Sequence, residues 1–170
     1  GLPGPLDLLM LITNFRRCLM DPIVHHELAA DLLSAAADSL LSEDFARCAA
    51  LLIQADMREL RDFSYKVAGP ISFEVHRQIK MPRFTPNTIE GIKRMPSKSI
   101  ERQIYHRDGW HCRYCGSRVI SKEARNIFQG HFPTEARKGR TNQENHFALA
   151  TLSATLDHVL PHKRGGNNET

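Results

Sequence analysis

Two cysteines and a glycine, Cys112, Cys115 and Gly116, restrict the local fold of this 170-residue chain more than any other feature. Two thiolates that lie two residues apart on a tight turn can bind one Zn²⁺ ion, and the glycine allows the backbone to fold back. A C-x-x-C motif is also typical of redox pairs, which follow a strand and open a helix, and of cysteines that only pack. A charged helix is predicted before this motif, which favours zinc.

A closed structural zinc site has four ligands, and the motif offers two of them. His131 and His146 are 15 positions apart, which is too far for the histidine pair of a zinc finger. Cys18 and Cys48 lie on apolar helical faces and are predicted to be small core residues. We therefore expect the missing ligands, a second C-x-x-C, in sequence beyond Thr170.

Residues 1–69 are predicted to form a helical domain. Leucines and alanines recur at helical spacing after Asp21-Pro22, which are predicted to be an N-cap and a first helical residue. Ser42 is a second predicted N-cap, and the helix after it is predicted to continue until Gly69. The buried faces are predicted to include Leu32, Phe45, Leu52 and Phe63.

Residues 70–98 are predicted to be a linker, because four prolines separate short segments there. Ser97 or Ser99 is predicted to cap a short helix over residues 100–106, which leads into the cysteine motif. Residues 99–170 are then predicted to form a second domain.

Charge is divided unevenly along the chain, whose net charge is +4. Residues 1–70 carry 6 basic and 10 acidic side chains, whereas residues 71–170 carry 17 basic and 9 acidic ones. A basic, histidine-rich half joined to an acidic half indicates that the second half faces a polyanion. A solvated surface with uneven charge explains the same numbers equally well.

Composition excludes several classes of protein. A hydrophobic content of 41% with 25% charged residues is unlike a disordered tail or a disulfide scaffold. No uninterrupted apolar run approaches the roughly 20 residues that are needed to span a bilayer. We expect a soluble, cytoplasmic protein with no membrane contact.

A second chemically informative pair, Asp157-His158, follows a strand-like run and precedes Pro161 and the turn Gly165-Gly166. A carboxylate can hold a hard divalent cation, and an imidazole that titrates near neutral pH can take a proton from water. A strand histidine that is half-buried against the preceding helix explains His158 as well, so the pair alone is weak evidence.

Together the two motifs resemble the HNH endonuclease family. The matching segments are residues 107–116, with Arg-Asp-Gly and C-x-x-C-Gly, and residues 156–166, with Leu-Asp-His and a Gly-Gly turn. Some members of the family also share the run Ser-Ala-Thr-Leu-Asp-His, which is residues 153–158 here. The resemblance implies an α+β fold class, in which the helical N-terminal domain is followed by a ββα-metal domain over residues 99–170. That domain is expected to be incomplete here, because the family's next Asn would follow Thr170.

The resemblance implies a metal-dependent endonuclease that hydrolyses DNA, as in restriction or phage defence. His158 would be the general base, and Asp157 would bind a catalytic Mg²⁺ or another divalent cation. Cys112 and Cys115 would be half of a structural zinc site. Without the downstream Asn, the chain as given is expected to lack part of its active site.

The remaining expectations concern partners. Arg113, Lys163 and Arg164 would contact DNA phosphates, and the helical half would dock a protein partner or a second protomer. The 41 residues between Cys115 and Asp157 are more than the compact family members need, and suit either DNA backbone contact or a small subcore. The alternative function is a zinc-stapled nucleic-acid-binding module without hydrolytic activity.

Overall fold

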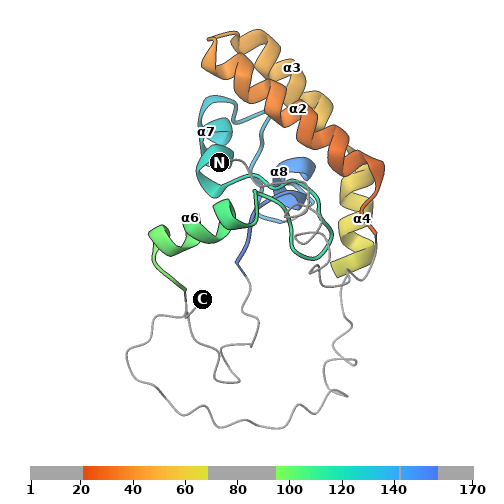
Figure 1. The fold of residues 1–170 in the computed structure, drawn as a ribbon. Coiled ribbons are helices and arrows are strands. Elements are labelled where there is room, and N and C mark those ends of the chain that lie inside the picture. The colour runs from red at the N-terminus through yellow and green to blue at the C-terminus, as the bar shows by residue number, and fades with distance from the viewer. Residues whose placement is uncertain (1–20, 69–94, 142, 157–170) are drawn as a thin grey trace, which may run out of the picture. The chain divides into compact units, whose positions relative to one another are not determined.

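The computed structural model describes residues 21–68, 95–141 and 143–156 (Figure 1). Its helices are α2 (Val24–Leu41), α3 (Phe45–Ala55), α4 (Arg58–Ala68), α6 (Lys98–Arg107), α7 (Lys122–His131) and α8 (Phe147–Thr151). The chain separates into two units. The described part of one unit is residues 21–68 and 110–154, and that of the other is residues 95–109 and 155–156. The predicted domain boundaries at residues 69 and 98 stay a prediction.

Helix α2 begins later than the sequence predicts. Its N-cap position is Ile23, which has extended backbone and no side-chain cap, so Asp21-Pro22 is not the predicted cap. The Ile23 carbonyl instead accepts from both the backbone N–H and Nδ1 of His26, at 3.0 and 3.1 Å. His26 is buried, so this interaction fixes the start of the helix against the core.

The N-cap of α3, in the turn between α2 and α3, is not the residue that the sequence predicts. Ser42 does not cap α3; its hydroxyl donates to the carbonyls of Asp38 and Ser39 at the end of α2. Asp44 is the N-cap of α3, and its carboxylate accepts from the Arg47 N–H at 3.0 Å. A carboxylate at this position also interacts favourably with the helix dipole.

The predicted long helix from residue 45 to residue 68 is broken at Asp56. Its backbone leaves the helical region there, with φ −79° and ψ 61°. The Asp56 carboxylate accepts from the Phe147 N–H at 2.7 Å and pairs with Arg137. The break therefore serves tertiary contacts with residues far along the sequence, which helical periodicity does not reveal.

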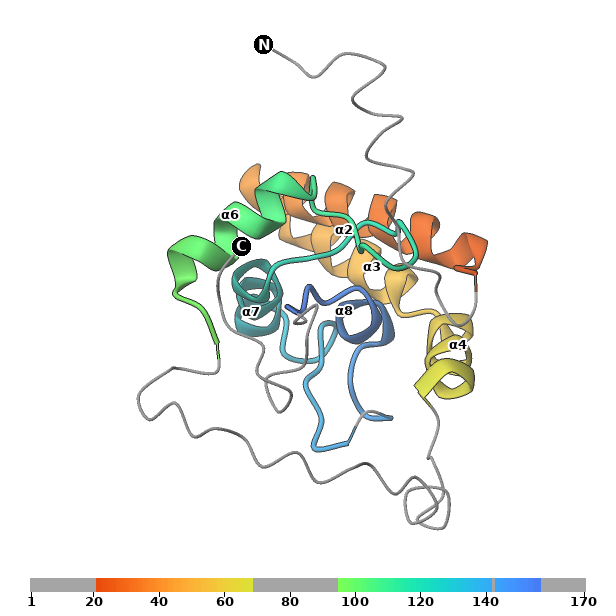
Figure 2. The same ribbon diagram turned by 60° about the horizontal axis from the view of Figure 1, so that its bottom comes forward.

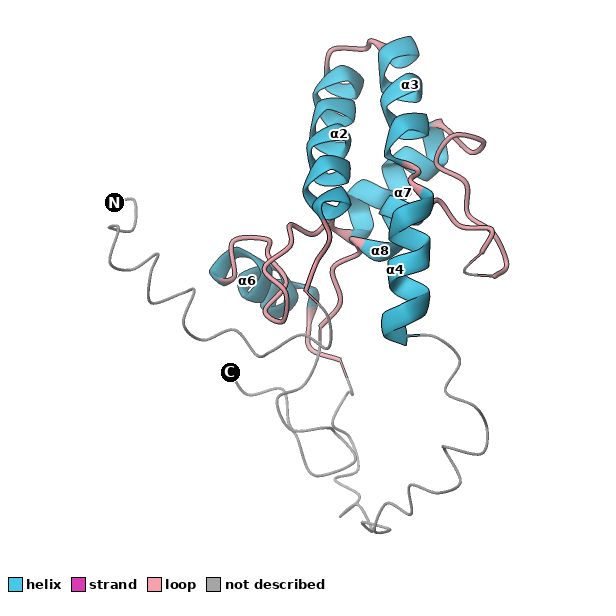
Figure 3. Cartoon of the chain, turned by 90° about the vertical axis from the view of Figure 1, so that its right-hand side faces the viewer, coloured by secondary structure: helices cyan, strands magenta, loops and turns pink. Residues whose placement is uncertain are grey.

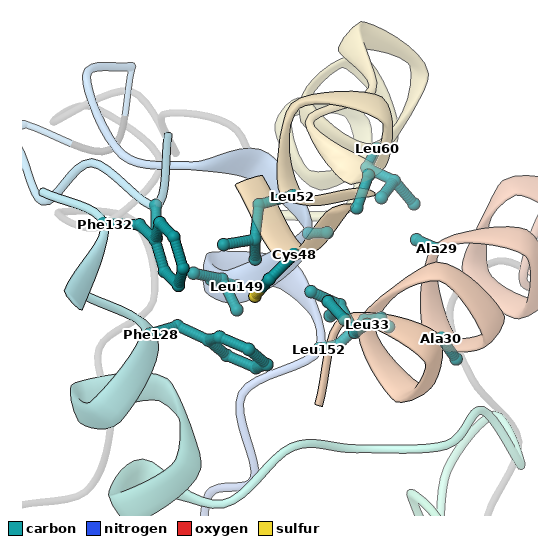
Figure 4. Packing of buried hydrophobic residues seen from close by; sticks show 14 residues of the cluster. Ala29, Ala30, Leu33, Cys48, Leu52, Leu60, Phe128, Phe132, Leu149 and Leu152 are labelled. Carbon is teal, nitrogen blue, oxygen red and sulfur yellow. The ribbon is translucent and has the colours of Figure 1, made fainter. Parts of the chain in front are cut away.

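One hydrophobic core unites the N-terminal helices with the segment between the two motifs (Figure 4). Figures 2 and 3 show α2 and α3 side by side, and α8 contacts α4 and α2. Helix α7 contributes Phe128 to the same core. The largest fully buried apolar side chains come from α3, α4 and α8. The core consists of Ala29, Ala30, Leu33, Ala36, Cys48, Leu52, Ala55, Leu60, Phe128, Phe132, Ala136, Ala148, Leu149 and Leu152.

The predicted buried face is right for Leu52 and wrong for Phe45. Leu52 is fully buried, and Leu32 and Phe63 are partly buried. Phe45 is 49% exposed, because it stands at the first position of α3 beyond the end of the α2 stripe. Its ring stacks on His131, with centroids 6.3 Å apart.

The predicted α+β fold class is wrong for the described residues. They are mostly helical and hold only two isolated bridges, an antiparallel one between His111 and Arg118 and a parallel one between Ile120 and Ser153. No ββα-metal domain is found in this part of the chain. The physical reason is that the segment between the motifs forms α7 and α8, whose apolar side chains complete the core of the N-terminal helices.

Helix α6 confirms one of the two predicted caps. The Ser97 hydroxyl accepts from the Ile100 N–H at 3.4 Å, and the helix begins at Lys98. None of the helices within the described ranges is long and apolar enough to cross a membrane.

Candidate functional site

The cysteine turn, residues 110–118, is closed by backbone hydrogen bonds. The Cys112 N–H donates to the Ser117 carbonyl, and the Gly116 N–H donates to the Cys112 carbonyl, both at 2.8 Å. Gly116 has φ +75°, a left-handed conformation that glycine adopts without steric cost. The fold-back that the sequence predicts at Gly116 is therefore present.

Both cysteines in the turn are free, and their thiols are close enough to hydrogen-bond each other. The pKa of Cys112 is raised, because it is the donor of this bond and because it is partly buried. The pKa of Cys115 is lowered to about 5, first by the Cys112 thiol and then by Ser117, against the opposing effect of burial. The hydrogen bond between the two thiols therefore favours the thiolate of Cys115, and a thiolate is the form that binds metals.

Backbone N–H groups also face the two sulfurs. Those of Tyr114 and Cys115 favour the thiolate of Cys112, and that of Ser117 favours the thiolate of Cys115. Ser117 is buried, and its Oγ lies 3.4 Å from the Cys115 Sγ. Donors around a pair of sulfurs stabilise negative charge on them, as a site for a thiolate-bound metal requires.

The donor set fits zinc, because thiolates are ligands that Zn²⁺ prefers. The redox interpretation is less favoured, since the next helix after the turn starts only at Lys122. Within the described ranges, no group of three or more side chains could hold a metal ion. The cysteine turn thus offers two candidate ligands, and the complete zinc site stays a prediction.

Arg118 links the cysteine turn to α2. Its Nε donates to the Glu27 carboxylate at 3.0 Å, and its Nη2 donates to the Glu27 carbonyl at 3.1 Å and to Asp31 at 2.6 Å. These partners raise the pKa of the guanidinium, Asp31 most strongly. The charge of His26, on the same helix, also lowers the pKa of Cys115. Helix α2 therefore lies beside the cysteine turn (Figure 2).

The segment that follows the cysteine turn pairs through its backbone with residues 152–154. The Ile120 N–H donates to the Leu152 carbonyl at 2.7 Å, and the Ala154 N–H donates to the Ile120 carbonyl at 2.9 Å. Ile120 follows the cysteine turn, and residues 152–154 lead directly into Asp157. Residues 152–154, which precede the second motif in the sequence, therefore lie beside the segment that follows the cysteine turn.

Two hydrogen bonds of the Ser153 side chain stabilise this backbone pairing. Arg125 on α7 donates through Nη1 to the Ser153 hydroxyl at 2.5 Å, and that hydroxyl donates to the Leu149 carbonyl at 2.7 Å. Ser153 therefore contacts α7, α8 and Ile120 at once.

The segment between the motifs is a structural subcore rather than an open basic loop. Phe128 and Phe132 are buried, and Arg137 pairs with Asp56. His146 is fully buried: its Nε2 lies 2.8 Å from the Leu52 carbonyl, and its Nδ1 accepts from a backbone N–H of α8. Of the two roles that the sequence leaves open for this segment, the observed packing favours the subcore.

The predicted catalytic residues Asp157 and His158 lie outside the described residues, as do Lys163 and Arg164. Their roles stay predictions. Arg113 is described, partly buried inside the cysteine turn next to Cys112.

Sequence reasoning missed two residues that organise this region, Ser117 and Arg118, which hold the turn and its link to α2. It placed Arg125 among the basic residues between the motifs without its observed partner, Ser153. Ser153 lies inside the Ser-Ala-Thr-Leu-Asp-His run, which is the one signal that pointed to it. Long-range partners of single arginines leave no periodic pattern in a sequence.

No protein-family model, no curated protein and no solved structure matches the chain.

Proposed function

We propose that this chain belongs to a metal-dependent endonuclease of the HNH type, which hydrolyses DNA phosphodiester bonds. The proposal rests on the two motifs, residues 107–116 and residues 156–166, and on the way the described segments beside them pair.

The pairing of Ile120 with residues 152–154 is the observation that supports the proposal most. Cys115 and Asp157 are separated by 41 residues, so nothing in the sequence alone requires the segments beside them to pair. Closing so long a segment opposes folding through chain entropy. The helices α7 and α8 offset that entropy by burying apolar side chains in the shared core.

The cysteine turn has the role of a staple in this proposal. Cys112 and Cys115 would bind zinc together with ligands from sequence outside the described residues. Zinc supplies a rigid tetrahedral link between chain segments and takes no part in hydrolysis. The lowered pKa of Cys115 to about 5 and the N–H groups that face both sulfurs support this role.

Asp157 and His158 carry the chemistry in this proposal. Asp157 would bind Mg²⁺ or another divalent cation, which supplies electrostatic stabilisation of the charge on the scissile phosphate. The His158 imidazole would accept a proton from the attacking water. Arg113, Lys163 and Arg164 would contact phosphates without reading the base sequence.

The N-terminal helices are proposed to dock a protein partner or a second protomer. Their buried faces are used within the chain, but Val24, Leu28 and Leu41 on α2 are 76%, 47% and 84% exposed. Large apolar side chains in solvent support a further contact there.

The test compares cleavage with binding in the full-length protein. Supercoiled plasmid is incubated with protein and Mg²⁺, and binding to the same sequence is measured by fluorescence anisotropy in Ca²⁺. His158→Ala is expected to slow cleavage by about 10²–10⁴-fold, and to leave the dissociation constant within about twofold, because many phosphate contacts share the binding energy. His162→Ala, in the same segment, is the matched control and is expected to retain cleavage.

The outcomes separate the two candidate functions. Cleavage by His158→Ala at the wild-type rate would remove the general base from the proposal. If the wild-type protein binds DNA but does not cleave it in the presence of any divalent cation tested, the alternative function, a zinc-stapled binding module, is supported instead.

A further inference from the structure

We propose that Arg118 is a positioning residue for the metal ligands, which couples the cysteine turn to α2 so that metal binding and folding of the N-terminal helices stabilise each other. This inference rests on the zinc site of the proposed function and not on DNA cleavage. It gives the helical half a role within the metal site, besides any role in docking a partner.

Arg118 is fixed to the cysteine turn through the backbone. It forms the antiparallel bridge with His111 across the open end of the turn. Its neighbour Ser117 accepts from the Cys112 N–H at 2.8 Å, so the bond that closes the turn is one residue away. A displacement of Arg118 is therefore transmitted directly to the backbone that sets the positions of Cys112 and Cys115.

The guanidinium of Arg118 is fixed at its other end to α2. Glu27 and Asp31 are four residues apart, so their carboxylates lie on the same face of the helix. Arg118 contacts both carboxylates and also the Glu27 backbone carbonyl, at 3.0, 2.6 and 3.1 Å. A planar guanidinium with several N–H donors can make these contacts at once, which the single ammonium of lysine cannot.

The part of α2 that Arg118 contacts is itself rigidly held. His26, next to Glu27, is buried and packs edge-on against Phe63 of α4, with ring centroids 4.6 Å apart. Its Nδ1 is hydrogen-bonded to the Ile23 carbonyl. The start of α2 is thus a firm support for the cysteine turn rather than a frayed helix end.

The coupling free energy between the cysteine turn and α2 is expected to be moderate, because the ion pairs that carry it are exposed to water. The side chains of Arg118, Glu27 and Asp31 are 36%, 57% and 68% exposed, and exposed ion pairs are weak and screened by salt. Removing the guanidinium removes two such ion pairs and one hydrogen bond to a backbone carbonyl. We expect this to weaken metal binding by about tenfold. The same factor is expected to shrink in concentrated salt.

The experiment measures zinc affinity and helix stability in the full-length protein. Zinc dissociation constants are determined by competition with a chromogenic chelator, and unfolding is followed by circular dichroism at 222 nm with and without zinc. Arg118→Ala is compared with Arg118→Lys and with the control Lys122→Ala, which removes an exposed cation four residues away. Cys115→Ser tests the zinc site itself.

We expect Arg118→Ala to weaken zinc binding by about tenfold at low salt, Arg118→Lys to weaken it less, and Lys122→Ala to leave it within about twofold. Combining Arg118→Ala with Glu27→Gln and Asp31→Asn should add no further loss, because the partners are already separated. Zinc should raise the unfolding temperature of the wild type more than that of Arg118→Ala, since coupling is reciprocal.

Two results would overturn the inference, and they are distinguishable. Wild-type zinc affinity in a folded Arg118→Ala or Arg118→Lys variant would remove the coupling while leaving the zinc site in place. A zinc affinity that Cys115→Ser does not change would remove the zinc site of the proposed function, and the inference with it.

Discussion

His146 caps two helices with one buried imidazole, and its removal is expected to destabilise the chain strongly. Its Nδ1 accepts from the Leu149 N–H at 3.2 Å, at the start of α8. Its Nε2 donates to the Leu52 carbonyl at 2.8 Å, near the end of α3. Since Nδ1 must accept, the ring is neutral with its proton on Nε2. His146→Ala leaves both backbone groups without their partners.

The size of the effect follows from these contacts. Loss of a helix cap costs about 1 kcal/mol, and an unsatisfied buried carbonyl costs about 1–3 kcal/mol. A total of about 3 kcal/mol is expected once the space left by the fully buried ring is included. That is a large share of the 5–15 kcal/mol that typically stabilises a domain. His146→Asn keeps an acceptor near the start of α8 and is expected to lose about 1 kcal/mol less.

The pH dependence of stability gives a second readout of the same residue. Burial lowers the pKa of His146, and Arg137 also lowers it, whereas the bond to Leu52 and the charge of Asp56 oppose them. The unfolded chain, with a histidine pKa of about 6.5, therefore takes up the proton more readily than the folded one. The contribution of neutral His146 to the free energy of unfolding is therefore fully present above about pH 6.5. It is lost as the pH falls from there toward the pKa of His146 in the folded chain.

Urea unfolding at pH 7.5 and at pH 5 measures both effects. The wild type should lose more stability between these pH values than His146→Asn, in which this group no longer titrates. If His146→Ala unfolded at the wild-type urea concentration, or showed the wild-type pH slope, the double-cap interpretation would be wrong.

Two glycine substitutions test the backbone assignments by urea unfolding. Gly116→Ala has no steric neighbour within 4 Å of the new Cβ, yet φ is +75°, so a loss of about 1 kcal/mol is expected from backbone strain alone. A Gly116→Ala protein with the same free energy of unfolding as the wild type would contradict the left-handed conformation at Gly116. Gly130→Ala also meets nothing within 4 Å and lies in α7, so a gain of about 0.5 kcal/mol is expected from helix propensity. A loss of stability there would contradict the helical assignment.

Helical periodicity predicted that residues 21–68 are helical, and local capping chemistry predicted Ser97. The buried stripe of α2 includes His26, Ala29, Leu33 and Ala36, and Leu32, which was predicted to be buried, lies at its edge and is partly buried. Alanines and leucines on neighbouring stripes of the helix bury similar apolar area. The sequence therefore indicates the helical repeat but not which of these stripes faces the core.

The fold class could not be predicted, because the apolar residues of the segment between the motifs pack on helices that are distant in the sequence. Phe128, Phe132 and Leu149 belong to the core of the N-terminal helices. Contacts such as Asp56 with Arg137 join residues far apart in sequence, and no local pattern encodes them.

The candidate site was predictable where its chemistry is local. Cys112, Cys115 and Gly116 form the expected turn, with free and adjacent sulfurs. Arg118 acts through distant partners, so sequence reasoning gave it no role, and the bond of Arg125 to Ser153 could likewise not be predicted.

The most direct test of the proposed function is the dependence of DNA cleavage on the divalent cation in the wild type and in Asp157→Ala. Single-turnover nicking of supercoiled plasmid is measured across a range of Mg²⁺ concentrations. If Asp157 holds the cation, the wild type cleaves only when the cation is present, and Asp157→Ala is nearly inactive at low Mg²⁺ and partly restored at high Mg²⁺. Cleavage by Asp157→Ala with the wild-type rate and Mg²⁺ dependence would contradict the proposal.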